Sequence, residues 1–113
     1  MLVVHGTPLV AEDLRDMLMS SGARAVELAP ALPETPPAEP FDTCVLAVSS
    51  RDWPDAGLPA RAARMAAHVV LIMGFPRPDL RLPPHVAVLA EPFRDADVLA
   101  ALTAAWRGPG DPA

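Results

Sequence analysis

Five short apolar runs, separated by helix-favouring or proline-rich segments, constrain the fold of this chain more than any other feature. Continuous apolar runs of this length are typical of strands that are buried on both faces of a sheet. They lie at residues 2–4, 25–28, 44–48, 69–74 and 86–90, and the run VVLIMG is the clearest of them. Because helix-favouring segments alternate with the runs, we expect parallel strands joined by right-handed crossovers, with helices on both faces. The predicted fold class is α/β, a doubly wound, five-stranded parallel sheet.

Three segments of the chain predict helices. Apolar residues at helical spacing follow Thr7, which is the expected N-terminal cap of the first helix, and Gly22 is its expected stop. An alanine-rich segment predicts a second helix at 59–67. Apolar side chains on one face predict the last helix at 95–106.

Two proline-rich stretches interrupt the alternation. Five prolines fall between Pro30 and Pro40, where a fold of this kind would place its second helix, and four more lie in FPRPDLRLPP at 75–84. Each proline removes a backbone N–H and disfavours helix at the preceding residue. We therefore expect a connector in place of the second helix, and a short or distorted fourth helix. The simplest interpretation of the connector is a rigid surface loop, although Pro30, Pro33 and Pro36 also have the spacing of a PxxP recognition motif.

Length, charge and cysteine content narrow the class of protein. The 113 residues suit one domain, expected at 1–107, followed by a flexible tail at 108–113. The net charge is −5 and the nine basic residues are scattered arginines, which argues against nucleic-acid binding. No apolar run approaches the roughly 20 residues of a membrane span, and the first residues lack a basic leader, so we expect a cytoplasmic protein. The single cysteine, Cys44, is expected to be a buried, inert thiol.

Five segments of the chain, taken in order, have the strand, turn and helix patterns of one known family. LVVHGTPLVAEDLRDML is a strand followed by a proline-initiated helix, and FDTCVLAVSSRDWPDAG is a buried strand with a polar loop. VVLIMGFP is a third such strand, and VLAEPF is followed by the helical DVLAAL. In this order they resemble the receiver domain of bacterial two-component response regulators. The turn GFP and the prolines after it are most similar to single-domain receivers with a Phe-Ala-Thr-Gly-Tyr motif. The resemblance implies a flavodoxin-like arrangement of the sheet.

Receivers accept a phosphoryl group on an aspartate that ends the third strand, beside Mg²⁺ held by acids that follow the first strand. The positions of this chain that match the acid pair are His5 and Gly6, and the acceptor position is Ala47. Met73 stands at the position of a hydroxyl residue, and Glu91 at that of a lysine. None of the five can perform the family role. We therefore expect no phosphorylation, no enzyme activity, and neither a cofactor nor a resident metal.

Some alternatives stay open at the same turns. The resemblance implies a cis peptide bond before Pro92. A shift of the register by two residues would place Ser49 at the acceptor position, but a serine without a metal or a base is a poor nucleophile. His5, Asp52 and Glu91 together offer imidazole and carboxylate ligands for a transition metal. A small-ligand or metal sensor that uses this pocket is therefore the alternative function.

The function that these features predict is a phosphorylation-independent receiver that acts as a signalling protein-interaction module. The resemblance implies as partner a histidine kinase, a phosphotransfer protein or an output protein, or a second copy in a homodimer. An enzyme of another flavodoxin-like family is the weakest interpretation, because no nucleophile–base pair is present. The residues expected to contact partners are Pro8, Leu9 and Asp13 with Pro92 and Phe93, then Phe75 and Trp106, and Trp53 as an exposed aromatic in a polar loop.

Overall fold

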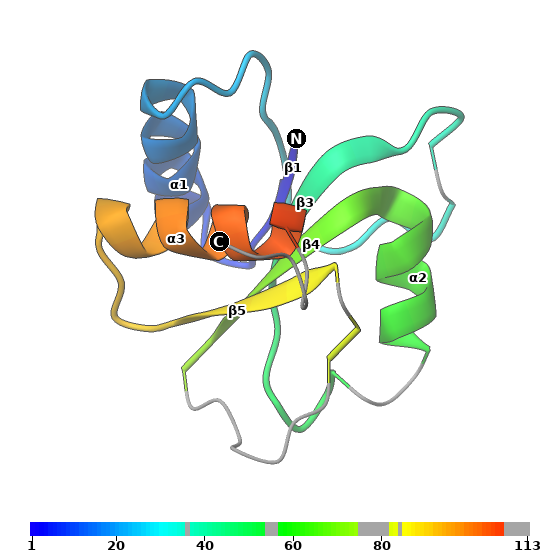
Figure 1. The fold of residues 1–113 in the computed structure, drawn as a ribbon. Helices are drawn as coiled ribbons and strands as arrows, with labels where there is room; N and C mark the ends of the chain where they lie inside the picture. The colour runs from blue at the N-terminus through cyan, green and yellow to red at the C-terminus, as the bar shows by residue number, and fades with distance from the viewer. Residues whose placement is uncertain (36, 54–56, 75–81, 84, 108–113) are drawn as a thin grey trace.

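The computed structural model describes residues 1–35, 37–53, 57–74, 82–83 and 85–107, and its centre is a five-stranded sheet (Figure 1). All neighbouring strands are parallel, and their order across the sheet is β2-β1-β3-β4-β5. The strands are β1 (Leu2–Val4), β2 (Glu27–Ala29), β3 (Phe41–Ala47), β4 (Ala66–Met73) and β5 (Val86–Ala90). The chain thus forms the parallel sheet that its apolar runs predict.

The described residues form three helices, which cover the two faces of this sheet. They are α1 (Pro8–Ser20), α2 (Leu58–Met65) and α3 (Asp95–Arg107). α1 and α3 lie on one side of the sheet and α2 lies on the other (Figure 1). Side chains of α1 and α3 form one apolar cluster with the sheet, and side chains of α2 form another on the opposite face. Helices on both faces of a parallel sheet define a doubly wound α/β architecture, as predicted.

Several boundaries differ from those that the sequence predicts. The second strand begins at Glu27, two residues later than expected, and the third begins at Phe41, three residues earlier than expected. The alanine-rich helix ends at Met65, not at residue 67, because Ala66 pairs with Phe41 at the start of β4. Pairing between strands therefore overrides the helix propensity of alanine at this point.

The segment between β2 and β3, residues 30–40, is called the connector below. Its described residues, 30–35 and 37–40, contain no helix, as the prolines predict. Most of the segment for which a short fourth helix is expected, 75–84, lies outside the described residues, as do Phe75 and the expected tail at 108–113. No helix in the described part of the chain is long and apolar enough to cross a membrane.

The ends of α1 confirm one of the two signals found in the sequence. Gly22 has φ +108, and the Ala23 amide donates to the Leu18 carbonyl, so glycine ends the helix in the left-handed region as predicted. Thr7 lies at the cap position, but its side chain makes no capping hydrogen bond. Only its carbonyl takes part in the helix, by accepting from the Ala11 amide at 3.1 Å.

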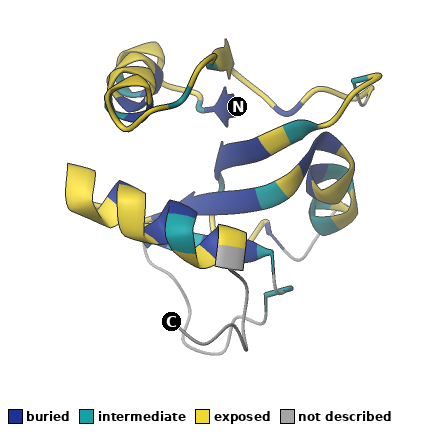
Figure 2. Ribbon diagram, turned by 45° about the horizontal axis from the view of Figure 1, so that its top comes forward, coloured by how far each residue is buried: buried dark blue, intermediate teal, exposed yellow. Residues whose placement is uncertain are grey.

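The cluster under α1 and α3 is built almost entirely from regular elements (Figure 2). Leu14 and Leu18 of α1 are buried against the sheet, as are Val98 and Leu102 of α3. These residues recur every three or four positions, which is the spacing that places side chains on one face of a helix. The helical periodicity of the sequence therefore accounts for this half of the core.

The cluster on the opposite face needs side chains from outside the helices. Leu32 of the connector and Trp53 of the loop after β3 are buried there beside Met65 of α2. Trp53 is only 2% exposed, so the expectation of an exposed aromatic residue at this position is wrong. With α2 as the only helix that the described residues place on this face, the indole covers apolar surface that α2 leaves uncovered. Burying so large a side chain is strongly favourable.

Candidate functional site

The ends of four strands bring the predicted site positions to one edge of the sheet. Val4, Leu46 and Leu71 are partners along β1, β3 and β4, so the strands end at similar heights. The five positions that follow or end these strands are His5, Gly6, Ala47, Met73 and Glu91. The structure therefore gathers all five at the carboxyl edge, where parallel sheets place their ligands.

Three of the five positions at this edge, Gly6, Ala47 and Met73, have no ionisable side chain. Met73 is buried in the core, and Ala47 is half-buried at the end of β3. Glu91 is exposed, and its backbone amide donates to the Met73 carbonyl at 3.0 Å. A carboxylate at this position would repel an anionic group that approached the edge.

His5 is fixed by hydrogen bonds to its own neighbourhood. Its backbone amide donates to the Ala29 carbonyl at 3.0 Å, which extends the β1–β2 pairing. Its Nδ1 accepts from the Thr7 amide at 3.0 Å, so the proton of the neutral ring resides on Nε2. The imidazole thus shapes the turn into α1.

The loop after β3 places its polar residues in a local turn. The Asp52 amide donates to Oγ of Ser49 at 3.1 Å, and the Trp53 amide donates to the Ser49 carbonyl at 3.0 Å. The Ser49 hydroxyl therefore stabilises the loop that delivers Trp53 to the core. Within the described residues no three histidine, cysteine, aspartate or glutamate side chains are close enough to hold a metal. His5, Asp52 and Glu91 are thus not brought together as the metal hypothesis requires.

A cavity of about 570 Å³ opens at the carboxyl edge between the connector and α2, and is called the carboxyl cavity. His5, Gly6 and Ala47 line it together with Asp52 and Arg61. Arg61 is half-buried, and its Nη2 donates to the carbonyl of connector residue Leu32 at 3.1 Å. Sequence reasoning missed Arg61, because nothing in its local pattern separates it from the exposed Arg64 one turn away on α2.

The Glu91–Pro92 peptide bond is cis, which agrees with the expectation for this bond. Pro92 itself is exposed. Phe93, the next residue, is half-buried and packs against the cluster under α1 and α3. The turn between β5 and α3 therefore presents one exposed and one half-buried apolar residue at the carboxyl edge.

Most of the expected partner-contacting residues lie on the surface, but at two separate places. Pro8, Leu9 and Asp13 are exposed on α1, and Leu9 is 70% exposed. Trp106 is 47% exposed, but it lies at the amino edge of the sheet, at the far end of α3 from Phe93. Trp106 is therefore not part of the surface around the start of α1.

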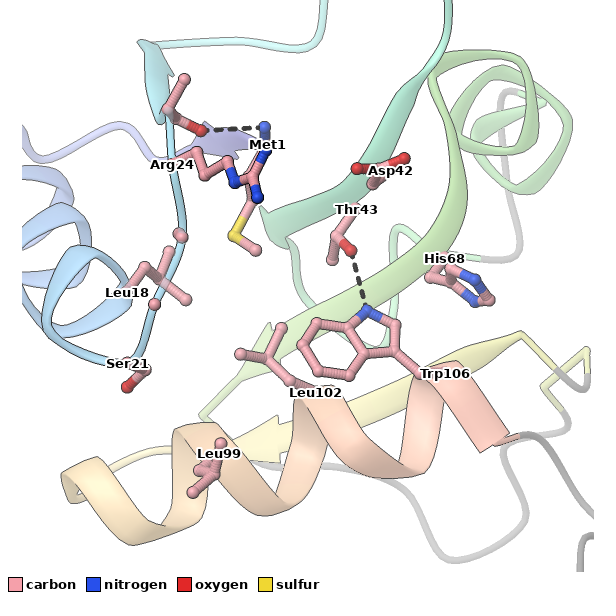
Figure 3. Close-up of a pocket in the computed structure, with 13 residues that line it drawn as sticks. Met1, Leu18, Ser21, Arg24, Asp42, Thr43, His68, Leu99, Leu102 and Trp106 are labelled. Atoms are coloured by element: carbon pink, nitrogen blue, oxygen red, sulfur yellow. Dashed lines mark hydrogen bonds between the residues drawn. The ribbon is translucent and has the colours of Figure 1, made fainter.

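A second cavity, of about 630 Å³, lies at the amino edge and is called the amino cavity. Trp106 lines it together with the loop after α1 and the first residues of β3 and β4 (Figure 3). Sequence reasoning did not find this cavity, because the rule for parallel sheets directs attention to the carboxyl edge. Comparisons of the chain with protein-family models, with curated proteins and with solved structures give no match.

Proposed function

We propose that this chain is a degenerate receiver domain that acts, without phosphorylation, as a protein-interaction module. The observation on which the proposal rests is the composition of the carboxyl edge. At this edge of a complete five-stranded sheet, the positions that carry the phosphorylation site in receivers are occupied by His5, Gly6, Ala47, Met73 and Glu91.

The strand order supports a flavodoxin-like, receiver-type fold within the α/β class. An order of 2-1-3-4-5 is that of flavodoxin-like sheets, whose ligands bind beside the first and third strands. The described strands follow the same order, with α1 and α3 on one face and α2 on the other. In this proposal the connector replaces the second helix of the family, and Leu32 and Trp53 cover the sheet in its place.

The chemistry of the edge supports a module without catalytic activity. Receivers accept the phosphoryl group on a carboxylate, and Ala47 has only a methyl group. Mg²⁺ prefers several oxygen ligands in octahedral geometry, which His5 and Gly6 do not supply. Glu91 adds a negative charge where receivers stabilise a phosphoryl group with a cation. The domain would therefore function without Mg²⁺ and without a phosphoryl donor.

The surface around the start of α1 supports a protein partner. Leu9 is the most exposed of the large apolar residues in the described chain, and Pro8 beside it is also exposed. Pro92 and Phe93 add apolar surface at the same edge of the sheet. In the receiver family this region contacts the helices of histidine kinases and phosphotransfer proteins. We therefore propose such a helical bundle as the partner, which places the chain in the cytoplasm.

The absence of phosphorylation is tested with a small phosphoryl donor and Mg²⁺. Intact mass and thermal unfolding of the chain should be the same with and without both reagents. A receiver that retains its acceptor aspartate, treated in parallel, shows that the reagents are active. A stable phosphoryl adduct on this chain would contradict the proposal.

The partner surface is tested by charge substitutions at the two ends of α1. Histidine kinases and phosphotransfer proteins of the source cell are assayed for binding to the wild-type chain, to Leu9→Glu and to Met19→Glu. Met19 is exposed on the same helix but lies near its carboxyl end, so it is a matched control. We expect Leu9→Glu to weaken binding at least about tenfold, as expected for an apolar contact at an interface centre. Binding by none of these proteins, or equal loss in both variants, would contradict the proposal.

The carboxyl cavity favours a small-ligand sensor as the second candidate function. Its volume of about 570 Å³ suits a small molecule, and Arg61 supplies a cation at its wall. Nucleotides, whose phosphates Arg61 can pair with, are tested by thermal shift on the wild-type chain, on Arg61→Ala and on Arg64→Ala. A ligand that raises the melting temperature of the wild type and of Arg64→Ala, but not of Arg61→Ala, would favour the sensor.

A further inference from the structure

The amino cavity is formed by segments that are far apart in the sequence. Its wall comes from the end of α1 and the loop after it, and from the first residues of β3 and β4. Leu99, Leu102 and Trp106, along one side of α3, complete it (Figure 3). Its volume of about 630 Å³ lies within the range of small-molecule pockets. It is at the opposite end of the strands from the carboxyl edge, so a ligand here would be independent of the function proposed above.

One side of the amino cavity is apolar and open to solvent. Leu18 of α1 and Leu102 of α3 are buried, and their side chains face the same space (Figure 3). Leu99 and Trp106 of α3 also line it, yet each remains about half exposed. A ligand with an apolar body would remove this exposed surface from water, which is favourable in proportion to the area covered.

The aromatic wall of the cavity is held in one position. Nε1 of Trp106 donates to Oγ1 of the fully buried Thr43 at 2.9 Å. Nδ1 of His68 donates to the Ala105 carbonyl at 3.1 Å, since a carbonyl can only accept. These two bonds fasten the end of α3 to β3 and β4. The indole is therefore positioned before any ligand arrives, which lowers the entropic cost of binding.

The polar part of the wall carries the Arg24 guanidinium, the Asp42 carboxylate and the Met1 ammonium, and this ammonium donates to the Ala25 carbonyl at 3.1 Å. Arg24 extends from the loop after α1 toward β3, and Asp42 lies across the space from it on that strand (Figure 3). Among the described residues the one ion pair is between Arg15 and Asp16, so Arg24 and Asp42 are more than 4 Å apart. The charges of Arg24 and Asp42 are free to pair with groups of a ligand.

We propose that the amino cavity binds a free α-amino acid with a branched aliphatic or aromatic side chain. The apolar side chain packs against Leu102 and the Trp106 indole, the carboxylate pairs with Arg24, and the ammonium pairs with Asp42. A ligand with a carboxylate alone would face the unpaired charge of Asp42, and an amine alone would face that of Arg24. A zwitterion satisfies both charges, and charge complementarity of this kind determines specificity.

The two tryptophans of the chain provide the measurement. Trp106 lines the amino cavity, whereas Trp53 is buried in the cluster on the opposite face of the sheet. L-leucine and L-phenylalanine are titrated into ¹⁵N-labelled protein, and the two indole N–H resonances are assigned with Trp106→Phe. We expect saturable movement of the Trp106 resonance and little change at Trp53. No movement of Trp106 up to about 10 mM amino acid, equivalent to a binding free energy weaker than about −3 kcal/mol, would overturn the proposal.

Analogues and variants test the assignment of the two charges. 4-Methylpentanoate has no ammonium group, isoamylamine has no carboxylate, and glycine has no apolar body. Each should bind at least about tenfold more weakly than L-leucine, and equal binding by any one of them would overturn the zwitterion assignment. Arg24→Ala and Asp42→Asn should each weaken L-leucine binding by a similar factor, whereas Arg64→Ala, on α2, should leave it unchanged. Unchanged binding in the first two variants would also overturn it.

Discussion

The two faces of the sheet are covered by different means. On one face α1 and α3 supply nearly all of the buried side chains that do not come from strands. On the other face α2 is joined by Leu32 of the connector and Trp53 of a loop. One face of a parallel sheet can therefore be covered without a second helix, where single large apolar residues in loops take the place of the apolar side chains of that helix.

The prolines of the connector explain how a loop can do this. Pro30 and Pro33 stand on either side of Leu32 and restrict the conformations of the unfolded chain. Less conformational entropy is then lost when the connector is ordered against the sheet. The Arg61 guanidinium adds a hydrogen bond to the Leu32 carbonyl. The connector is thus held at Leu32, the one buried residue among its described positions.

The largest expected effect is that of removing Trp53. Trp53→Ala should lower the free energy of unfolding by about 3–5 kcal/mol, because it deletes a fully buried indole. Trp106→Ala on the other face should cost only about 1–2 kcal/mol, because that indole is half exposed and makes one hydrogen bond. Urea unfolding of both variants measures the difference.

A conservative change keeps this comparison informative if Trp53→Ala does not fold. Trp53→Phe preserves an aromatic ring in the core, and it should be less destabilised than Trp53→Ala. Equal losses for the alanine variants at Trp53 and Trp106 would show that the loop residue does not replace a helix on its face.

The second prediction concerns Cys44, which lies in the cluster on the α2 face. Burial raises the pKa of its thiol from 9.0 to about 12. Between these values the unfolded thiol is ionised and the folded one is not, so the unfolded state binds fewer protons and stability falls as the pH rises. By about pH 11 the loss should be about 3 kcal/mol, and below pH 9 it should vanish.

The composition of the chain makes this alkaline loss specific to one residue. The sequence contains no lysine and no tyrosine, so Cys44 is the side chain that titrates in this range. Urea unfolding of the wild type and of Cys44→Ala at pH 8 and at higher pH measures the dependence. A variant that loses stability as steeply as the wild type would show that the buried thiol is not the cause.

The third prediction tests the bond between α2 and the connector. Arg61→Ala should destabilise the chain by about 1–2 kcal/mol, because it removes the donor to the half-buried Leu32 carbonyl. Arg64→Ala, exposed on the same helix, should stay within about 0.5 kcal/mol of the wild type. The double variant Arg61→Ala/Leu32→Ala should lose less free energy of unfolding than the sum of the two single losses, because both changes release the connector. A loss in the double variant equal to the sum of the two single losses would contradict a shared role of Arg61 and Leu32.

The smallest expected loss of stability is at the end of α1, on the face of the sheet that α1 and α3 cover. Gly22→Ala should cost about 1 kcal/mol, because φ +108 is unfavourable for a residue with a Cβ. Gly6→Ala is the matched control, with no positive φ and no atom within 4 Å of an added Cβ, and it should change stability by less than about 0.5 kcal/mol. Thermal unfolding compares the two, and a larger loss at Gly6 would contradict the assignment.

Much of the carboxyl edge could be predicted from the sequence. Strands buried on both faces are recognised by continuous apolar runs, and parallel strands bring their carboxyl ends together. His5, Ala47 and Glu91 therefore meet at one edge, as expected. Arg61 could not be predicted there, because its place depends on how α2 packs beside the connector.

The amino cavity lay beyond prediction for the same kind of reason. Trp106 has the helical spacing of a core residue, yet it is half exposed and bonded to Thr43, which lies 63 positions away in the chain. Arg24 and Asp42 belong to segments that are unrelated in local pattern. A cavity of this kind exists only after α3 has been placed against the sheet.

The helices, the strands and the residue types at the carboxyl edge all follow from local features of the sequence. Apolar periodicity and proline positions are local properties, and they specify strands, helices and the connector without knowledge of the rest of the chain. The burial of Trp53 in the core and the cavity at the amino edge depend instead on how the elements pack. Burial depends on which surfaces meet, and such contacts are made between residues that the sequence keeps far apart.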